Sequence, residues 1–172
     1  MRPTGRDTIA GMFLLRLLAM LALVVWVGGL VALAIAAPAT FDVMAIRQIP
    51  DGRLLAGAVF GEILRRFFLA SCAAAAVILV SLTLRRILGP KPRRFGWRAG
   101  ILILMTASTV YAGVTIAGRI AALQASIGVA PSSLPAADPR RIEFGRLHMM
   151  STALQLVPLL GGLALIFWEL RE

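Results

Sequence analysis

Residues 17–37 read LLAMLALVVWVGGLVALAIAA, a run of 21 residues without a charged side chain. Three more uncharged apolar stretches follow at 67–84, 99–118 and 147–168, with lengths of 18, 20 and 22 residues. At about 1.5 Å of rise per residue, helices of these lengths span the roughly 30 Å hydrocarbon core of a bilayer. The sequence therefore predicts an all-α integral membrane protein, in which a single four-helix transmembrane domain covers residues 1–172.

The composition and the charge of the chain agree with this class. Hydrophobic residues make up 59% of the chain and the mean hydropathy is +0.87, which exceeds what soluble domains usually carry. The formal net charge is +10, but the basic residues stand at the ends of the apolar stretches, where arginine contacts lipid phosphate. We therefore expect the lipid bilayer as partner, and no nucleic acid.

The amino terminus resembles a secretory signal peptide, because Arg2 and Arg6 precede an apolar run that ends in the small residues at 34–37. The run is longer than the usual apolar region of such signals, which is about 7 to 15 residues. We interpret it as the first membrane helix.

Six of the ten basic residues on the side of the two termini lie in the short stretch 85–98. Short, positively charged loops tend to remain in the cytoplasm. The pattern predicts cytoplasmic amino and carboxyl termini, in what we expect to be the inner membrane of a bacterium. The six residues are Arg85, Arg86, Lys91, Arg93, Arg94 and Arg98.

The loops on the other side carry signals for turns and helix ends. Asp51 and Gly52 predict a turn before the second helix, which is expected to begin outside the apolar stretch. The third helix is expected to continue to a stop at Gly128. Asp138 followed by Pro139 is typical of a helix amino terminus and predicts the start of the fourth helix.

Small residues at four-residue spacing predict close packing between the membrane helices. Trp26 lies too deep in the first stretch for an interfacial position, so its indole N–H is expected to face the interior of the bundle. The residues expected to form the helix contacts are Trp26, Gly28, Gly29, Gly113, Gly161 and Gly162.

One polar constellation is a candidate site. His148 is the only histidine, and Thr152 and Gln155 follow it on one helical face, while Tyr111 and Thr115 lie in the outer half of the preceding stretch. An ionisable residue in a membrane helix is a functional candidate because lipid cannot solvate it. His148 has four interpretations: a hydrogen bond between helices, an axial ligand of haem or chlorophyll, a ligand of a transient metal, or a proton relay.

No catalytic motif accompanies this constellation. The sequence shows no nucleophile elbow, no phosphate-binding glycine loop and too few histidines and cysteines for a zinc site. Cys72, the single cysteine, is expected to pack as a small apolar residue. Glu62 is expected to pair with Arg65 or Arg66 near a helix end. We therefore predict no enzymatic activity and no obligatory cofactor.

Several short motifs resemble a known family. Trp26-Val27-Gly28-Gly29 followed by Pro38 and Phe41, the pair Ala56-Gly57, and the segment from Phe144 to Ser151 resemble the DUF4149 family, which includes the TMEM205-like proteins. A more remote similarity links the chain to copper-resistance membrane domains of the CopD type. Leu154-Gln155 departs from the pattern, because an asparagine is expected there. The resemblance implies four membrane helices but no established activity.

Three functions are compatible with these observations. The first is a non-enzymatic accessory or structural subunit of a larger membrane complex of the respiratory or photosynthetic type. The second is a small permease or copper-type metal-handling protein that uses His148 and its polar neighbours, with self-association to complete a pathway. The third is a subunit that binds a pigment or haem at His148.

Overall fold

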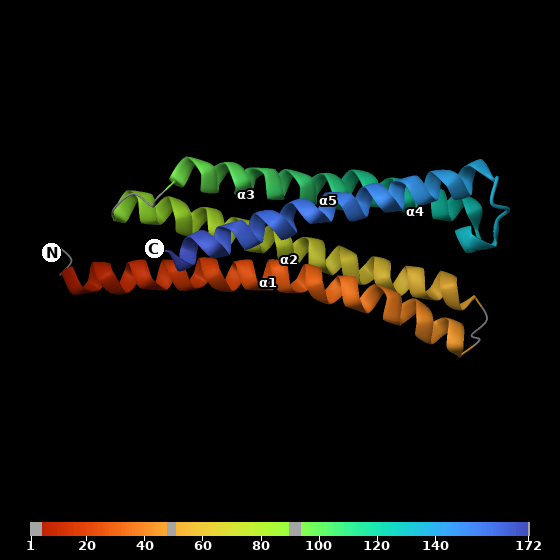
Figure 1. Cartoon of the computed structure of the whole chain (residues 1–172), viewed down its shortest axis with the longest axis horizontal. Helices are drawn as coiled ribbons and strands as arrows, with labels where there is room; N and C mark the ends of the chain where they lie inside the picture. The colour runs from red at the N-terminus through yellow and green to blue at the C-terminus, as the bar shows by residue number, and fades with distance from the viewer. Residues whose placement is uncertain (1–4, 48–50, 90–93, 172) are drawn as a thin grey trace.

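The computed structural model describes residues 5–47, 51–89 and 94–171. In this part of the chain all regular structure is helical and no strand occurs, which confirms the predicted all-α class. Four helical segments are long and apolar enough to cross a membrane, so the chain is a multi-pass membrane protein. Along the chain (Figure 1) the elements are α1 Gly5–Ile46, α2 Gly52–Leu88, α3 Phe95–Val110, a π-helix Tyr111–Ile116, α4 Ala117–Ile127, a 3₁₀-helix Pro131–Ser133 and α5 Pro139–Leu170.

The helices extend beyond the uncharged stretches that predict them. α1 continues past Pro38 to Ile46, whereas the first apolar stretch ends at residue 37. Pro38 removes one backbone donor, yet the helix continues, and the Thr40 hydroxyl donates to the Ala36 carbonyl oxygen at 2.8 Å in the same turn. α3, the π-helix and α4 form one continuous rod from Phe95 to Ile127.

The predicted helix boundaries outside the apolar stretches are confirmed. Asp51 adopts a left-handed conformation at the start of α2, and its carbonyl oxygen accepts bonds from the amides of Leu54 and Leu55. Gly128, with φ of 70°, ends α4, and a residue without a Cβ adopts this conformation most easily. Asp138 caps α5, because its carboxylate accepts the Arg140 amide at 2.8 Å.

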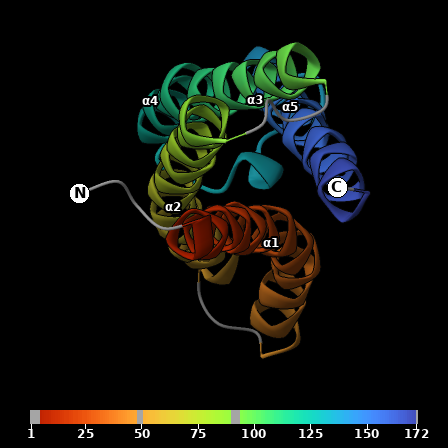
Figure 2. The same ribbon diagram turned by 90° about the vertical axis from the view of Figure 1, so that its left-hand side faces the viewer.

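The helices form an elongated bundle in which α1 packs on α2, and α5 packs on both α1 and α3 (Figure 1). The start of α1 and the end of α5 lie at one end of this bundle, together with the end of α2 and the start of α3 (Figure 2). We name this the terminal end. The opposite end, where α1 leads to α2 and α4 leads to α5, is named the loop end. The cytoplasmic location of the terminal end remains a prediction.

The core lies between all four spanning segments. Trp26 and Leu23 of α1 are 1% exposed, and Met105 of α3 is fully buried among them. The remaining buried members of this cluster are Ala22, Leu30, Ala74, Ala75, Ile78, Leu102 and Leu165. Many other large apolar side chains are exposed on the outside of the bundle, as expected for helices whose outer surface contacts lipid.

Four glycines allow close contacts between the helices of the bundle. A Cβ on Gly29 would collide with the Phe67 ring of α2, and a Cβ on Gly162 would collide with Val27 of α1. Gly113 and Gly161 are equally close to Phe68 and Met105. These four glycines therefore lie at contacts between helices, where small residues let the backbones approach.

Gly28 differs from the other glycines that were expected in helix contacts. It is exposed, and a Cβ added to it would have no neighbour within 4 Å. Two residues along an α-helix correspond to a rotation of about 200°, so Gly28 cannot share the face of Trp26. The expectation that Trp26 and the Gly28-Gly29 pair all face inward is wrong for Gly28.

Candidate functional site

Glu169, in the last turn of α5, has more ion-pair partners than any other carboxylate in the described part of the molecule. Its side chain is nearly buried, and its Oε1 accepts hydrogen bonds from Arg85 Nη1 of α2 at 2.7 Å and from Arg98 Nη1 of α3 at 2.8 Å. Both arginines are 3% exposed. A single carboxylate oxygen thus joins three helices through charge-assisted hydrogen bonds, which are shorter and stronger than neutral ones.

The fourth helix reaches the same glutamate. Arg16 of α1 donates from Nη2 to the Glu169 backbone carbonyl at 2.7 Å, and its Nε lies 3.6 Å from Glu169 Oε2. The side chain of Arg16 is 40% exposed, so it connects the buried group to the surface. We call Arg16, Arg85, Arg98 and Glu169 the Glu169 cluster. Every spanning segment contributes one residue to it.

A small cavity adjoins the Glu169 cluster on the side of the apolar core. Its volume is about 20 Å³, which is enough for roughly one water molecule. The walls are apolar apart from the buried members of the cluster, so the charges lie at the boundary between core and terminal end. The lining residues are Ala19, Leu23, Ile78, Leu82, Arg85, Arg98, Leu165 and Glu169.

The burial of the Glu169 cluster determines what it can do. Charges removed from water lose several kcal/mol of hydration each, and their mutual attraction compensates this loss only when the geometry is good. Changing one member of a buried ion pair typically costs about 3–5 kcal/mol, whereas replacing the whole set by apolar residues is often neutral. The cluster is thus suited to fixing the relative positions of the helices, and it contains no nucleophile or acid–base pair aimed at a substrate site.

The sequence did not predict this cluster. Arg16, Arg85 and Arg98 were expected among the basic residues that contact lipid phosphate, but Arg85 and Arg98 are buried against a carboxylate. Glu169 was not a candidate residue. The position of Glu169 in the sequence could have indicated a buried ion pair. Glu169 directly follows the fourth apolar stretch, at the end of the bundle where arginines are concentrated.

Ion pairs at the loop end are local and exposed. Glu62 binds Arg65 and Arg66 of the same helix at 2.8 Å, which confirms the predicted pair. Arg119 and Glu143 join α4 to α5 at 3.3 Å with half-exposed side chains. These contacts lie within one helix or between two neighbours, so none of them joins the whole bundle.

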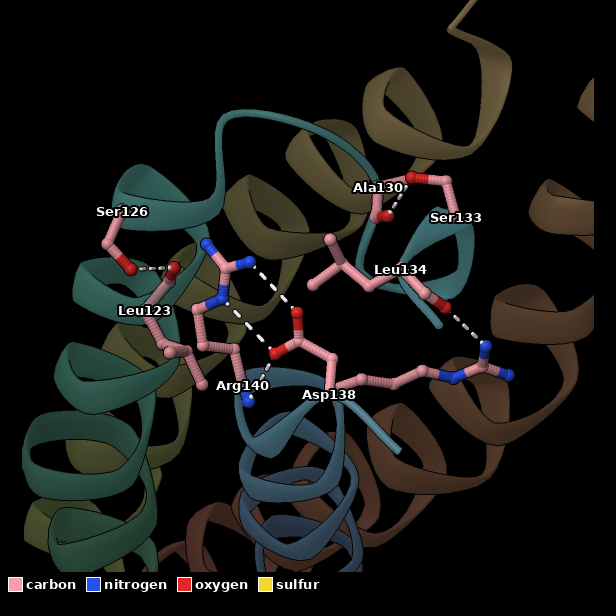
Figure 3. A network of polar contacts seen from close by, with 8 residues as sticks. Leu123, Ser126, Ala130, Ser133, Leu134, Asp138 and Arg140 are labelled. Atoms are coloured by element: carbon pink, nitrogen blue, oxygen red, sulfur yellow. Dashed lines mark hydrogen bonds and ion pairs between the residues drawn. The ribbon is translucent and has the colours of Figure 1, made fainter. Parts of the chain in front are cut away.

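The connection from α4 to α5 is ordered by short polar contacts (Figure 3). Asp138 accepts bonds from the amide and the guanidinium of Arg140, and these contacts lower the pKa of the Asp138 carboxyl below its ordinary value. Ser126 and Ser133 each donate to a carbonyl oxygen three residues earlier, at 2.7 Å. The Leu134 carbonyl accepts from Arg141 at 2.6 Å. The loop end is therefore fixed by capping and turn contacts.

The predicted polar constellation is dispersed. His148 is exposed and its ring stacks on Phe144 one turn earlier, with the ring centroids 6.2 Å apart. The Thr152 hydroxyl donates to the His148 backbone carbonyl, and Gln155 is half-buried. Tyr111 and Thr115 are exposed on the π-helix. Among the described residues, no hydrogen bond joins these side chains to one another.

Other polar groups lie within the bundle. The Ser108 hydroxyl donates to the Leu154 carbonyl at 2.8 Å and joins α3 to α5, a contact that the sequence did not predict. Trp26 Nε1 and Ser71 Oγ are both buried, and neither has a hydrogen-bond partner in the described part of the chain. The indole therefore faces the interior, but it does so without a polar partner. Within the described ranges no three His, Cys, Asp or Glu side chains meet as a metal site.

A family model described as "Domain of unknown function (DUF4149)" matches residues 21–128, which is more than half of the chain. The protein belongs to the DUF4149 family. This confirms the resemblance carried by the Trp26 to Gly29 motif, while the CopD similarity remains a prediction. Searches among curated proteins and among solved structures return no match.

The DUF4149 match places the Glu169 cluster partly inside the family segment. Arg85 and Arg98 lie within residues 21–128, whereas Arg16 precedes the segment and Glu169 follows it. The buried arginines are thus part of the matched DUF4149 segment, and their carboxylate partner comes from the last helix of this chain.

Proposed function

We propose that this DUF4149 protein is a non-enzymatic accessory subunit that packs against another membrane-embedded helix through the outer face of α1. The observation that carries the proposal is the exposure of Gly28 in the middle of a long apolar helix, with open space beside it. Ala32 and Ala39 continue the same exposed face, and we call these three residues the α1 small-residue face. Small residues at such spacing permit close helix approach in lipid.

The neighbouring side chains shape this face for a helix partner. Val24, Val31 and Ile35 are exposed beside the small residues. A partner helix could lie against Gly28 and Ala32 while these larger side chains pack on either side of it. The opposite face of α1 is occupied by the bundle core, including Trp26 and Leu23, so the free face is available for an intermolecular contact.

The interior of the bundle supports a structural role over an internal pathway. The core cluster fills the space between the helices, and the cavity beside Glu169 holds about 20 Å³. A permease needs a continuous polar route, and a cavity of this size accommodates roughly one water molecule. The function is therefore better supported on the outer surface than inside the bundle.

The test is copurification from native membranes at native expression level, with Gly28→Leu as the variant. Gly100→Leu is the matched control, because Gly100 is also exposed and has no neighbour within 4 Å of an added Cβ. We expect Gly28→Leu to lose a specific membrane partner that wild type and Gly100→Leu retain. Identical partners for all three proteins, or a monodisperse monomer with none, would contradict the proposal. Self-association lost only in Gly28→Leu would identify the partner as a second copy.

A second candidate function is ligand binding at His148, favoured by the exposure of its ring and by its stack on Phe144. An exposed imidazole is available to a metal, a haem or a chlorophyll from outside the bundle. Metal content and uptake in wild type and His148→Ala test metal handling or transport. An absorption spectrum tests pigment or haem binding, since a protein without the characteristic bands has neither.

The inner membrane of a bacterium remains our proposed location.

A further inference from the structure

The exposed arginines of the terminal end differ from its buried ones in their partners. Arg86, Arg94 and Arg171 are exposed, and none of them contacts a carboxylate in the described part of the chain. Glu169 of this end is buried and bound inside the Glu169 cluster. Its charge is therefore directed to the interior. Ten basic residues belong to this end, against the three acids Asp7, Glu169 and Glu172, so its sequence carries an excess of positive charge.

Two of these arginines are held by aromatic rings. The Arg86 guanidinium lies over the Phe95 ring at 4.5 Å, and the Arg171 guanidinium lies over the Phe167 ring at 4.1 Å. Stacking uses the flat face of the guanidinium and leaves its N–H edge available. That edge matches two oxygens of a phosphate group in a bidentate contact. The rings thus orient the cations without neutralising them.

The side chains around these arginines are apolar and exposed. Trp97 is 71% exposed, Leu170 is 73% exposed, and Ile87 is 69% exposed, each within three residues of one of the arginines along the chain. Indole rings favour the headgroup layer of a bilayer. A soluble anionic partner would leave these apolar groups in water, whereas a phospholipid offers a phosphate for the arginines and acyl chains for their apolar neighbours.

We infer that the terminal end carries a binding surface for anionic phospholipid headgroups, formed by Arg86, Arg94, Arg171 and Trp97, which we name the basic collar. Its residues come from the end of α2, the start of α3 and the end of α5, which surround the terminal end in Figure 2. The stretch 85–98 contains six basic and no acidic residues. Arg85 and Arg98 are paired with Glu169, and the other four basic residues have no acid within this stretch. The inference is independent of the proposed partner of the α1 small-residue face, which lies elsewhere on the molecule.

The loop end provides a matched control. Arg47, Arg53 and Arg146 are also exposed and contact no carboxylate among the described residues. Asp42 and Asp51 lie within five residues of Arg47 and Arg53 along the chain, and Glu143 lies three residues before Arg146. No aromatic ring of the described ranges stacks on these three arginines. Replacing three arginines at either end changes the net charge by the same amount, so only the location differs.

The experiment measures the lipids that remain bound after full-length protein is reconstituted in vesicles of phosphatidylcholine and phosphatidylglycerol, extracted and analysed by mass spectrometry. We expect wild type to enrich phosphatidylglycerol. Each arginine near an anionic surface strengthens binding about fivefold. The triple variant Arg86→Gln, Arg94→Gln, Arg171→Gln should therefore lose the enrichment, while Arg47→Gln, Arg53→Gln, Arg146→Gln should keep most of it.

Equal enrichment in the two triple variants, or none in wild type, would overturn the inference. Loss of a copurifying acidic protein or nucleic acid in the collar variant, with lipid retention unchanged, would also overturn it. The single variants at Arg86, Arg94 and Arg171 keep the test informative should the triple variant fail to fold, since each should lower the enrichment alone. Copurification of the membrane partner tests the proposed function separately. If the partner is retained while the lipid enrichment is absent, only the lipid inference fails.

Discussion

The two ends of the bundle use arginine in opposite ways. At the loop end, Glu62, Glu143 and Asp138 pair with arginines on the surface, within one helix or between two neighbours. At the terminal end, one buried glutamate binds arginines from the three other spanning segments. Arginine–carboxylate pairs therefore connect neighbouring residues or helices at the loop end, and all four spanning segments at the terminal end. The two sets differ in burial, because only the pairs of the terminal end include buried side chains.

Removal of the buried carboxylate should have the largest effect. Glu169→Gln places a neutral amide between two buried guanidinium groups, and we expect a loss of about 3–5 kcal/mol in the free energy of unfolding. Glu143→Gln at the loop end is the control and should change stability much less, because its partner is exposed. Denaturant titration of both variants in one detergent measures the difference. Similar losses for the two would remove the contrast between the ends.

Replacement of all buried charges should cost less than removal of one. The triple variant Arg85→Met, Arg98→Met, Glu169→Leu removes the charges together with their desolvation penalty. We expect its stability to exceed that of Glu169→Gln, and to approach or surpass that of wild type. A triple variant less stable than Glu169→Gln would show that the hydrogen bonds of the cluster contribute more to stability than the desolvation of its charges costs. Unfolding curves of the three proteins decide this point.

The exposed pairs should respond to salt where the buried cluster does not. Glu62→Gln breaks the contacts with Arg65 and Arg66, and its small effect on the unfolding midpoint should disappear at high ionic strength. The effect of Glu169→Gln should persist at the same salt concentration because the cluster is shielded from ions. A salt-insensitive Glu62→Gln effect would contradict the description of the loop end as solvated.

The smallest predicted effect concerns pH at the start of α5. Contacts with Arg140 lower the pKa of Asp138 below its ordinary value of 3.8. Because the pKa of Asp138 is lower in the folded than in the unfolded state, its ionised carboxylate stabilises the fold fully above the unfolded-state pKa. This stabilisation is lost as the pH falls through the folded-state pKa. Amide exchange in the first turn of α5 should therefore accelerate only in strong acid. Asp138→Asn should abolish this pH dependence, and an unchanged acid response would contradict the assignment.

Much of the fold could be predicted because lipid imposes a strong constraint on the sequence. The uncharged stretches predict the spanning segments, and Gly128 and Asp138 predict helix ends through local backbone chemistry. The lengths of the helices were less predictable, since α1 continues past Pro38 to Ile46, beyond the end of the first apolar stretch. The π-helix at Tyr111–Ile116 had no sequence signal that we could identify.

The candidate site was harder to predict than the fold. His148 attracted attention because it is the only histidine, yet its ring lies on the surface. Arg85 and Arg98 resemble ordinary flanking arginines in the sequence, and only the packing of α2, α3 and α5 brings them to Glu169. Contacts between residues separated by 71 or 84 positions depend on tertiary structure, which local patterns do not encode.

The most direct test of the joined terminal end is a double-mutant cycle between Glu169→Gln and Arg98→Gln, measured as free energies of unfolding in detergent. Residues in one buried network usually couple by about 0.5–3 kcal/mol, whereas independent sites add within about 0.5 kcal/mol. We predict that the double variant is substantially more stable than the sum of the single losses implies. Additive losses would show that Glu169 and Arg98 act independently and would contradict the account.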